Sequence, residues 1–359
     1  MTVSIWQTPT ATPPETVDTV IVGAGIIGSY LALRLREQGR DVLVLDARHA
    51  AGGASGRNGG LLVSGIAHSY VAARRDYGAD TARDLWALTV RNREAMIGWA
   101  TRLQTPVRRC GSIVLACNAE QHAELAESAE LLRADGFEAQ WHADDPLGRG
   151  FGGAIVTPSD GAVQAALLTQ ALLGHSGARL REGAEVYALE SQADGVLVRV
   201  RGGDVLAREV VVPARGQVLA TAPAPRILET TGYCNDGFEY FHQLPDGRFV
   251  LGGFRNLAFD EERTWADHTT PLIQDALDAF IARHFRELRD VAVERRWSGT
   301  MAFTPDGLPL VGKLPHDPRI ACIVACNGHG LGFGLVVADQ LLAVLNGGDA
   351  GLFGLARVI

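Results

Sequence analysis

The stretch that decides the fold is residues 19–46, which read TVIVGAGIIGSYLALRLREQGRDVLVLD. An apolar run of strand length, Thr19 to Val22, leads into three closely spaced glycines. An apolar helical face follows and ends at Gly39, and a second apolar run, Val42 to Leu45, ends on Asp46. A strand, a helix and a second strand in this order predict a βαβ unit.

The small and acidic residues of this unit point to a dinucleotide. Gly23 permits the tight turn, Gly25 lets a pyrophosphate approach the backbone at the helix N-terminus, and Gly28 lets the helix pack closely on the strand. Asp46 can accept hydrogen bonds from ribose hydroxyls. The unit therefore predicts a cofactor site that includes Gly23, Gly25, Ile26, Ile27, Gly28 and Asp46.

This fingerprint alone does not separate FAD from NAD, and the next loop is the better discriminator. Residues 54–60 read ASGRNGG. Small residues let backbone amides face a flat ring, and Arg57 adds positive charge near phosphate or flavin. The alternative interpretation is a flexible surface loop. The candidate cofactor residues here are Ala54, Ser55, Arg57, Asn58, Gly59 and Gly60.

Three motifs together carry a resemblance to a known family. VGAGIIGS at 22–29, LDAR at 45–48 and GASGRNGG at 53–60 resemble the D-amino-acid oxidase (DAO) superfamily of flavoenzymes, which includes glycine oxidase, sarcosine oxidase and γ-glutamylputrescine oxidoreductase. GASGRNGG is most similar to the last of these. The resemblance implies FAD as cofactor and adds Ala47 and Arg48 to its expected contacts.

The expected fold class is α/β, with a Rossmann-type FAD-binding domain interleaved with an α+β substrate domain built on a mostly antiparallel sheet. A chain of 359 residues is long for one domain, which favours two. The expected segments are 17–70, 150–215 and 297–359 for FAD binding, 71–149 and 216–296 for substrate binding, and a flexible arm over 1–16. Helices are predicted over 74–103, 119–134, 163–173 and 271–284.

Composition excludes several classes of protein. With 47% hydrophobic and 21% charged residues and a net charge of −8, the chain has the composition of a soluble globular protein that binds neither nucleic acid nor a membrane surface. Its five cysteines are odd in number and set mostly among apolar residues, which favours free thiols in a reducing compartment and no metal site. With no expected secretion signal or membrane span, a cytoplasmic location is predicted, and a homo-oligomer is left open.

Further cofactor contacts follow from the resemblance only. Relatives lay the strand that begins at Val186 against the adenine half of FAD. Residues 297–309, WSGTMAFTPDGLP, resemble a family segment in which sarcosine oxidases attach flavin through a cysteine at the position of Gly299, so non-covalent FAD is expected. Residues 327–334, NGHGLGFG, follow an apolar strand and place a helix N-terminus with free amides against something negative, which in the family is the flavin. This segment adds Gly328, His329, Gly330, Leu331 and Gly332.

The residues expected at the reacting centre are His329, Arg255, Tyr240, His242 and Met301. Tyr240 and His242 alternate on one face of a strand, where they contact substrate if that face lies over the flavin and are ordinary sheet residues otherwise. Met301 stands where glycine oxidase and D-amino-acid oxidase relatives place an arginine that grips the substrate carboxylate. A substrate carboxylate is therefore absent at that point or held elsewhere, for example by Arg255. Arg255 also lies near where sarcosine oxidases place a basic residue that assists oxygen, or it is a surface arginine in a salt bridge.

One departure from the family lies at 210–217, VVVPARGQ, where a strand runs directly into PARGQ and a short helical crossover of the relatives is missing.

The implied activity is FAD-dependent oxidation of the C–N bond of a small-molecule amine or amino acid. Hydride passes to flavin N5, the imine is hydrolysed, and O2 or another acceptor reoxidises the flavin. Met301, Gly332 and the missing crossover leave two alternatives. One is a catalytically silent or electron-relaying flavin subunit of a larger oxidase. The other is a degenerate member that binds flavin poorly and acts through protein contacts.

Overall fold

The computed structural model describes residues 14–201, 203–207, 218–262, 264, 268–299, 301–324 and 326–357. The predicted loss of the crossover before Pro213 lies outside these residues, as do residues 1–13 of the predicted arm. The last predicted arm residues belong to the fold, because strand β1 (Glu15–Val17) pairs in parallel with β13 (Val205–Ala207).

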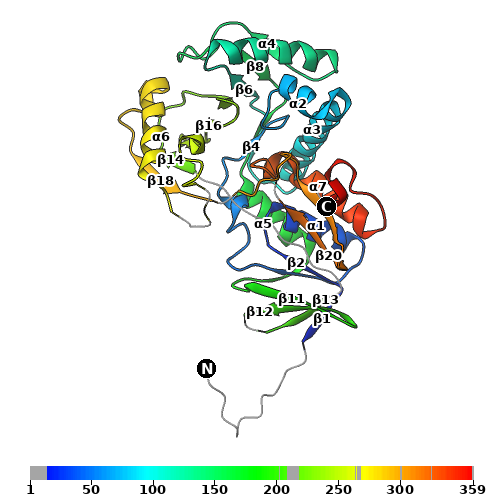
Figure 1. Ribbon diagram of the computed structural model, residues 1–359. Helices are drawn as coiled ribbons and strands as arrows, with labels where there is room; N and C mark the ends of the chain where they lie inside the picture. The colour runs from blue at the N-terminus through cyan, green and yellow to red at the C-terminus, as the bar shows by residue number, and fades with distance from the viewer. Residues whose placement is uncertain are drawn as a thin grey trace.

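The predicted βαβ unit forms the lower half of the molecule in Figure 1. Strand β2 (Thr19–Val22), helix α1 (Ile26–Glu37) and strand β3 (Val42–Leu45) follow one another, and β10 (Arg179–Arg181) extends the parallel sheet in the order β10-β3-β2. Because both faces of this sheet are apolar, each is covered. Helices α1, α5 (Ala165–Ser176) and α7 (Gly330–Leu345) pack on the face of Val42 and Val44, and a second sheet packs on the face of Leu43 and Leu45. That second sheet consists of β1, β13, β12 (Gly195–Val200) and β11 (Val186–Gln192).

An eight-stranded sheet forms the core of the upper half. Among its described strands one pair, β15 with β6, is parallel and the other pairs are antiparallel, so the sheet is mostly antiparallel, as expected. In spatial order its strands are β18 (Val293–Trp297), β14 (Val218–Thr221), β17 (Phe249–Gly252), β16 (Glu239–Gln243), β15 (Thr231–Cys234), β6 (Ser112–Leu115), β8 (Ala154–Thr157) and β7 (Gln140–His142).

The two faces of this sheet are covered differently. Helix α6 (Pro271–His284) packs on the face that carries Phe241 and Phe249, where aromatic rings form a dense cluster. On the other face, α2 (Tyr70–Tyr77) and α4 (Ala119–Ala134) cover the end formed by β6 and β8. The part of that face on β15, β16 and β17 is turned instead toward the βαβ half, where Gly59 meets the ring of Tyr240.

The structure corrects three sequence predictions. The helix expected over 74–103 is two helices, α2 and α3 (Ala79–Arg102), because Gly78 between them adopts φ +85°. The helix expected from Val163 begins at Ala165, since Val163 ends strand β9 (Gly161–Val163). The segment expected in the FAD domain from residue 150 includes β8, which lies in the eight-stranded sheet.

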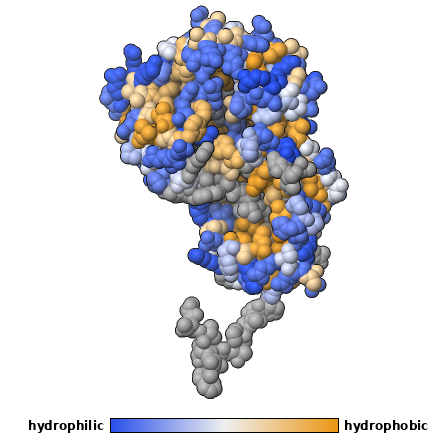
Figure 2. Space-filling model, viewed as in Figure 1, coloured by the Kyte–Doolittle hydropathy of each residue, from blue (hydrophilic) through white to orange (hydrophobic). Residues whose placement is uncertain are grey.

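The remaining described elements are strands and 3-10 turns. They are β4 (Leu61–Leu62), β5 (Val107–Arg108), β19 (Leu310–Leu314), β20 (Asp317–Val324) and 3-10 turns at Ala54–Gly56, Arg255–Leu257, Arg286–Leu288, Gly351–Phe353 and Leu355–Arg357. On the face shown in Figure 2, hydrophobic residues lie in separate patches and form no continuous belt. None of the helices within the described ranges combines the length and hydrophobicity needed to cross a bilayer.

Candidate active site

The glycine turn between β2 and α1 has the geometry that its sequence predicts. Gly23 adopts φ +107°, a conformation that side chains rarely tolerate. A Cβ on Gly28 would lie 2.1 Å from the Gly23 carbonyl oxygen, so only glycine lets the helix begin this close to the turn. Gly25 precedes the first helical residue, and the Ile26 amide donates to Ser55 Oγ at 2.8 Å. Ser55 thereby ties the loop at 54–60 to the start of α1.

Asp46 ends β3 beside this turn. Its carboxylate accepts hydrogen bonds from the amides of Ala24 and Arg48, both at 2.8 Å. The Ala184 amide donates to the Asp46 carbonyl at 2.8 Å, which brings the approach to β11, and hence Val186, alongside. Ala47 and Arg48 are exposed at the end of the strand. The structure thus gathers Asp46, Val186 and the glycine turn at one edge of the parallel sheet.

The loop at 54–60 is organised by its own side chains and by the C-terminal part of the chain. Asn58 Nδ2 donates to the carbonyls of Ala54 and Ser55, both at 2.9 Å, and its Oδ1 accepts from the Gly60 amide at 2.8 Å. Arg57 donates to the Ser298 carbonyl at 3.0 Å, and Trp297 Nε1 donates to the Arg57 carbonyl at 2.8 Å. Gly299, which is buried, is therefore held next to Arg57.

A second glycine-rich helix start lies at α7. Asn327 adopts φ +49° and Gly328 φ +79°, and the Asn327 amide donates to the Ala302 carbonyl, which lays residues 301–304 along this turn. His329 directly precedes the helix, and its Nδ1 lies 3.2 Å from the Asn327 carbonyl. Burial and the nearby His68 lower the pKa of His329, so the ring is neutral at pH 7. A Cβ on Gly328 would meet Met301 Sδ at 3.2 Å, which places Met301 beside His329.

Asn92 of α3 fixes the first turns of α7 from outside. Its Nδ2 donates to the Leu331 carbonyl at 2.6 Å, and its Oδ1 accepts from the Leu335 amide at 2.8 Å. Asn92 is fully buried, so its amide group is held rigidly. The sequence analysis did not single out this residue, since one Asn within an amphipathic helix carries no signal.

Both helix starts carry donors that suit an anionic, hydrogen-bonding cofactor. Within the described part of the chain, the amides of Ile27 and Gly28 in α1 and of Leu331 and Gly332 in α7 have no hydrogen-bond acceptor. Neither helix has an acidic residue in its first turn to satisfy these amides. Free amides at a helix N-terminus attract a pyrophosphate or another negatively charged group. The residues present therefore fit FAD.

The sheet above this region presents Tyr240 and His242 on the same face of β16. A Cβ on Gly59 would lie 3.1 Å from the Tyr240 ring, so the strand lies directly against the loop at 54–60. Tyr240 also faces Tyr233 across the sheet with ring centroids 6.1 Å apart, and burial raises the pKa of both phenols. Both hydroxyls are therefore protonated at pH 7.

His242 is 2% exposed, and neither of its ring nitrogens has a hydrogen-bond partner among the described residues. Burial, with the positive charges of Arg108 and Arg226, lowers the pKa of His242 to about 4. The Gly59 backbone offsets part of this shift. The ring is neutral and lies at the same loop as Tyr240.

Arg255 lies farther along the same region, beside the segment that carries Met301. Its guanidinium carbon is 4.2 Å from the centroid of Phe303, which is two residues beyond Met301. Burial lowers the pKa of Arg255, but a guanidinium stays charged at any pH at which proteins fold. The structure thus brings together His329 and Met301 in one group, Tyr240 and His242 in a second, and Arg255 at the edge of the first.

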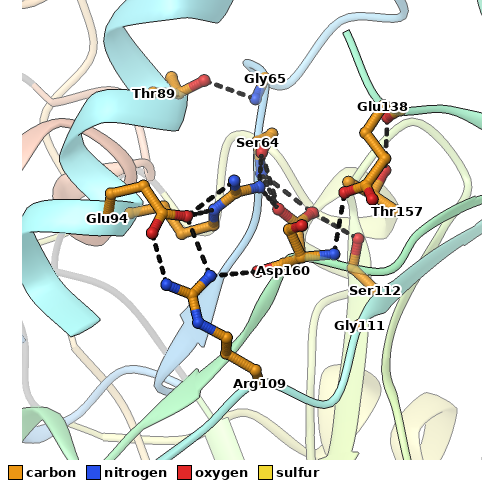
Figure 3. A network of polar contacts seen from close by, with 12 residues as sticks. Ser64, Gly65, Thr89, Glu94, Arg109, Gly111, Ser112, Glu138, Thr157 and Asp160 are labelled. Atoms are coloured by element: carbon orange, nitrogen blue, oxygen red, sulfur yellow. Dashed lines mark hydrogen bonds and ion pairs between the residues drawn. The ribbon is translucent and has the colours of Figure 1, made fainter. Parts of the chain in front are cut away.

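Figure 3 shows a polar network that the sequence analysis did not predict. Asp160 is completely buried and accepts hydrogen bonds from Ser64 Oγ at 2.7 Å, Ser112 Oγ at 2.6 Å and Arg93 Nη1 at 2.6 Å. Arg93 is 7% exposed and also donates to Glu94 at 3.0 Å. In the sequence Asp160 lies in a Pro-Ser-Asp-Gly stretch that predicts only a turn. Through Asp160 the network joins β6 and α3 to Ser64, which lies two residues beyond β4.

The comparisons with known proteins agree with this arrangement. The model of a family described as FAD dependent oxidoreductase (DAO) matches residues 18–343. γ-Glutamylputrescine oxidoreductase of Escherichia coli strain K12 is 28% identical over 382 residues, covering 94% of this chain and 85% of that protein. Glycine oxidase of Geobacillus kaustophilus is 26% identical over 386 residues, covering 95% and 97%.

The crystal structure of glycine oxidase from Geobacillus kaustophilus superimposes with a TM-score of 0.82 at 22% identity, covering 96% of this chain and 100% of that one. The βαβ nucleotide unit beside a mostly antiparallel sheet is thus an architecture that this chain shares with that structure. The chain belongs to the FAD-dependent oxidoreductase family named DAO, and its cofactor is FAD.

Proposed function

We propose that this protein oxidises the C–N bond of a small-molecule amine or amino acid. FAD, when bound, supplies the acceptor for the two electrons and the hydrogen that leave the carbon next to nitrogen. The product is an imine, which water hydrolyses, and O2 or another acceptor removes the electrons. The observation that carries the proposal is the pair of helix N-termini whose first amides have no acceptor among the described residues. His329 and Met301 lie beside the start of α7, and Tyr240 lies against the loop that Ser55 ties to the start of α1.

The chain's own residues have three tasks in this proposal. The amides at the start of α1, with Arg57 nearby, would hold the pyrophosphate of FAD, and those at the start of α7 would offer donors to a negatively charged part of the cofactor. The side chains of Tyr240, His242 and Met301 limit the access of water to the reacting carbon. None of these side chains is charged, which favours binding of the amine in its neutral form and makes a separate general base unnecessary.

Met301 also limits the substrate. Because a thioether cannot form the paired hydrogen bonds that an arginine makes with a carboxylate, the substrate carries no carboxylate beside its reacting carbon, or holds it elsewhere. Gly299 offers no atom for a covalent bond to flavin, so the cofactor is bound non-covalently. We infer a cytoplasmic location from the free cysteines and the composition.

The test is the visible spectrum of the purified protein before and after heat, followed by anaerobic addition of a panel of amines and amino acids. A yellow protein that releases FAD and is bleached by at least one panel member supports the proposal. A yellow protein that no member bleaches contradicts it and favours a catalytically silent or electron-relaying subunit. A colourless protein that cannot be reconstituted with FAD points to the degenerate alternative.

A further inference from the structure

Arg255 is a partly buried cation that has no acidic partner within the described part of the chain. Among the described residues, no Asp or Glu forms an ion pair with it and no oxygen accepts a hydrogen bond from its guanidinium. Its pKa is lowered by burial alone, without an opposing contribution from any carboxylate. Most other partly buried arginines of the described chain, such as Arg149 and Arg199, pair with an acid. The in-plane N–H donors of Arg255 are therefore available.

Three phenylalanines surround this cation. Its guanidinium carbon lies 4.2 Å from the ring centroid of Phe303, 5.3 Å from that of Phe238 and 5.4 Å from that of Phe259. Rings that contact the flat faces of a guanidinium hold it in place and leave its edge free. We call Arg255 and these three rings the arginine box.

The surroundings of the box are apolar and open. Phe259 and Phe303 are each 47% exposed, and Leu257 and Met301 are exposed as well. Four of the eight large hydrophobic residues that are exposed in the described chain therefore lie in or beside the box. Exposed apolar side chains around one unpaired cation fit a ligand that has a hydrocarbon portion and an anionic end.

The box is also next to the proposed reacting centre. Phe303 and Met301 belong to one extended segment, and the Asn327 amide donates to the carbonyl of Ala302 between them. Met301 Sδ in turn lies against Gly328, directly before His329. A ligand that reaches from His329 along Met301 and Phe303 arrives at Arg255.

We propose that Arg255 binds the remote carboxylate of the substrate, so that the substrate class is an amine joined to a carboxylate through an apolar spacer. This inference rests on the proposed function and names the substrate class for the same site. The carboxylate accepts from the edge of the guanidinium while the phenylalanines contact the spacer. The arrangement explains why position 301 can be a methionine. A carboxylate that is held at Arg255 is remote from the reacting carbon and needs no arginine at position 301.

The first experiment measures binding without turnover. Isothermal titration calorimetry compares hexanoate with hexanamide, an uncharged probe of the same shape, on the FAD-loaded protein. We expect the parent protein to bind hexanoate about 10- to 100-fold more tightly, the range for hydrogen bonds between charged groups, and Arg255→Met to bind both probes equally. Arg255→Lys should retain part of the preference, because it keeps the charge but loses the flat edge.

The matched control is Arg102→Met. Arg102 also stacks on an aromatic ring, 4.9 Å from the centroid of Trp99, and lies at the end of α3 outside the site. This variant should keep the parent's preference for hexanoate. If the parent binds both probes equally, or if Arg255→Met keeps the preference, the inference is wrong.

The second experiment separates this inference from the proposed function. Anaerobic bleaching of the bound flavin is followed with n-alkylamines and with ω-amino acids of equal length. Faster bleaching by the ω-amino acids that disappears in Arg255→Met supports the inference. Equal bleaching by both series in the parent protein overturns it and leaves the amine oxidase proposal standing. If neither series bleaches the flavin, the proposed function fails for these amines, and the calorimetric preference alone decides the role of Arg255.

Discussion

Two arginines of this protein are withdrawn from water in opposite settings. Arg93 donates to Asp160 at 2.6 Å and to Ser64 at 2.7 Å, two residues that are labelled in Figure 3. Arg255 lies in the arginine box, where it contacts three phenylalanine rings and has no acidic partner among the described residues. The chain supplies Arg93 with both a counter-charge and hydrogen-bond acceptors, whereas the described residues supply Arg255 with neither.

The difference separates a structural cation from a binding one. Removing a charge from water costs several kcal/mol unless a counter-charge and hydrogen bonds compensate it. Asp160, Glu94 and Ser64 compensate Arg93, so its position gains nothing from a ligand. Arg255 keeps part of its solvent contact and meets the remaining cost with ring contacts, which leaves a substrate carboxylate to complete the site.

His242 is a third basic side chain that is withdrawn from water, and it differs from both arginines because it can become neutral. Ser112, Thr231 and His242 are paired neighbours on the adjacent strands β6, β15 and β16. Ser112 donates to Asp160, and Tyr240 lies two residues before His242 on β16. With no partner for either ring nitrogen among the described residues, His242 loses its proton and becomes neutral. An arginine cannot do this, because its pKa exceeds 12.

The largest effect is expected from Asp160→Ala. This change removes the buried counter-charge of Arg93, leaving only the more exposed Glu94, and should lower the free energy of unfolding by about 3–5 kcal/mol. Urea unfolding followed by circular dichroism measures the loss. Glu94→Ala is the control, because Glu94 binds the same arginine but its side chain is 44% exposed, and its loss should cost less than about 1 kcal/mol. If both variants lost the same free energy of unfolding, burial would not be what makes the contact between Arg93 and Asp160 important.

A smaller effect, dependent on pH, is expected from His242→Gln. The folded pKa of His242 is about 4, below the ordinary 6.5, so its contribution to stability is complete above pH 6.5 and is lost as the pH falls toward 4. The parent protein should therefore lose about 3 kcal/mol relative to the variant over this range. Urea midpoints at pH 7 and pH 4.5 test this. The exposed His316→Gln should behave as the parent does, and a parallel pH profile for His242→Gln would contradict the expectation.

The smallest effect on stability is expected from Arg255→Met. Loss of the ring contacts and relief of the desolvation cost oppose each other, so the free energy of unfolding should change by less than about 1 kcal/mol. The same urea measurement tests this, with Asp160→Ala as the reference for a compensated charge. A loss above about 3 kcal/mol would mean that Arg255 is structural like Arg93, and the comparison between the two arginines would fail.

The sequence predicts the local parts of the fold well and the long-range polar contacts poorly. The unit at 19–46, helix α4 and helix α6 agree with their predicted bounds, because periodicity and glycine or proline signals are local. Gly78 divides the helix that was predicted over 74–103. The break was not predicted because the hydrophobic periodicity continues across Gly78, and only its positive φ reveals it. The pairing of Arg93 with Asp160 spans 67 residues, and no local pattern announces it.

The candidate site divides in the same way. The glycine turns and the loop at 54–60 were predicted from residue types and spacing. The contact between Tyr240 and Gly59 could not be predicted in this way. Alternation along one strand shows which residues share a face, but it does not show which face of the sheet turns toward the nucleotide unit. The three rings around Arg255 come from residues 238, 259 and 303, and only the folded chain brings them together.

The pairing of β6 with β15 bears on how this chain is made. Thr231 Oγ1 donates to the Gly111 carbonyl across 120 residues of sequence, so β6 leaves the ribosome long before its parallel neighbour exists. At synthesis rates of about 5–20 residues per second, that wait lasts roughly 6 to 24 s. Meanwhile β6 can pair only with β8 on its other side, and its open edge is a template for pairing with other nascent chains. Yield on overexpression should therefore depend on translation speed and chaperones more than on the stability of the finished fold.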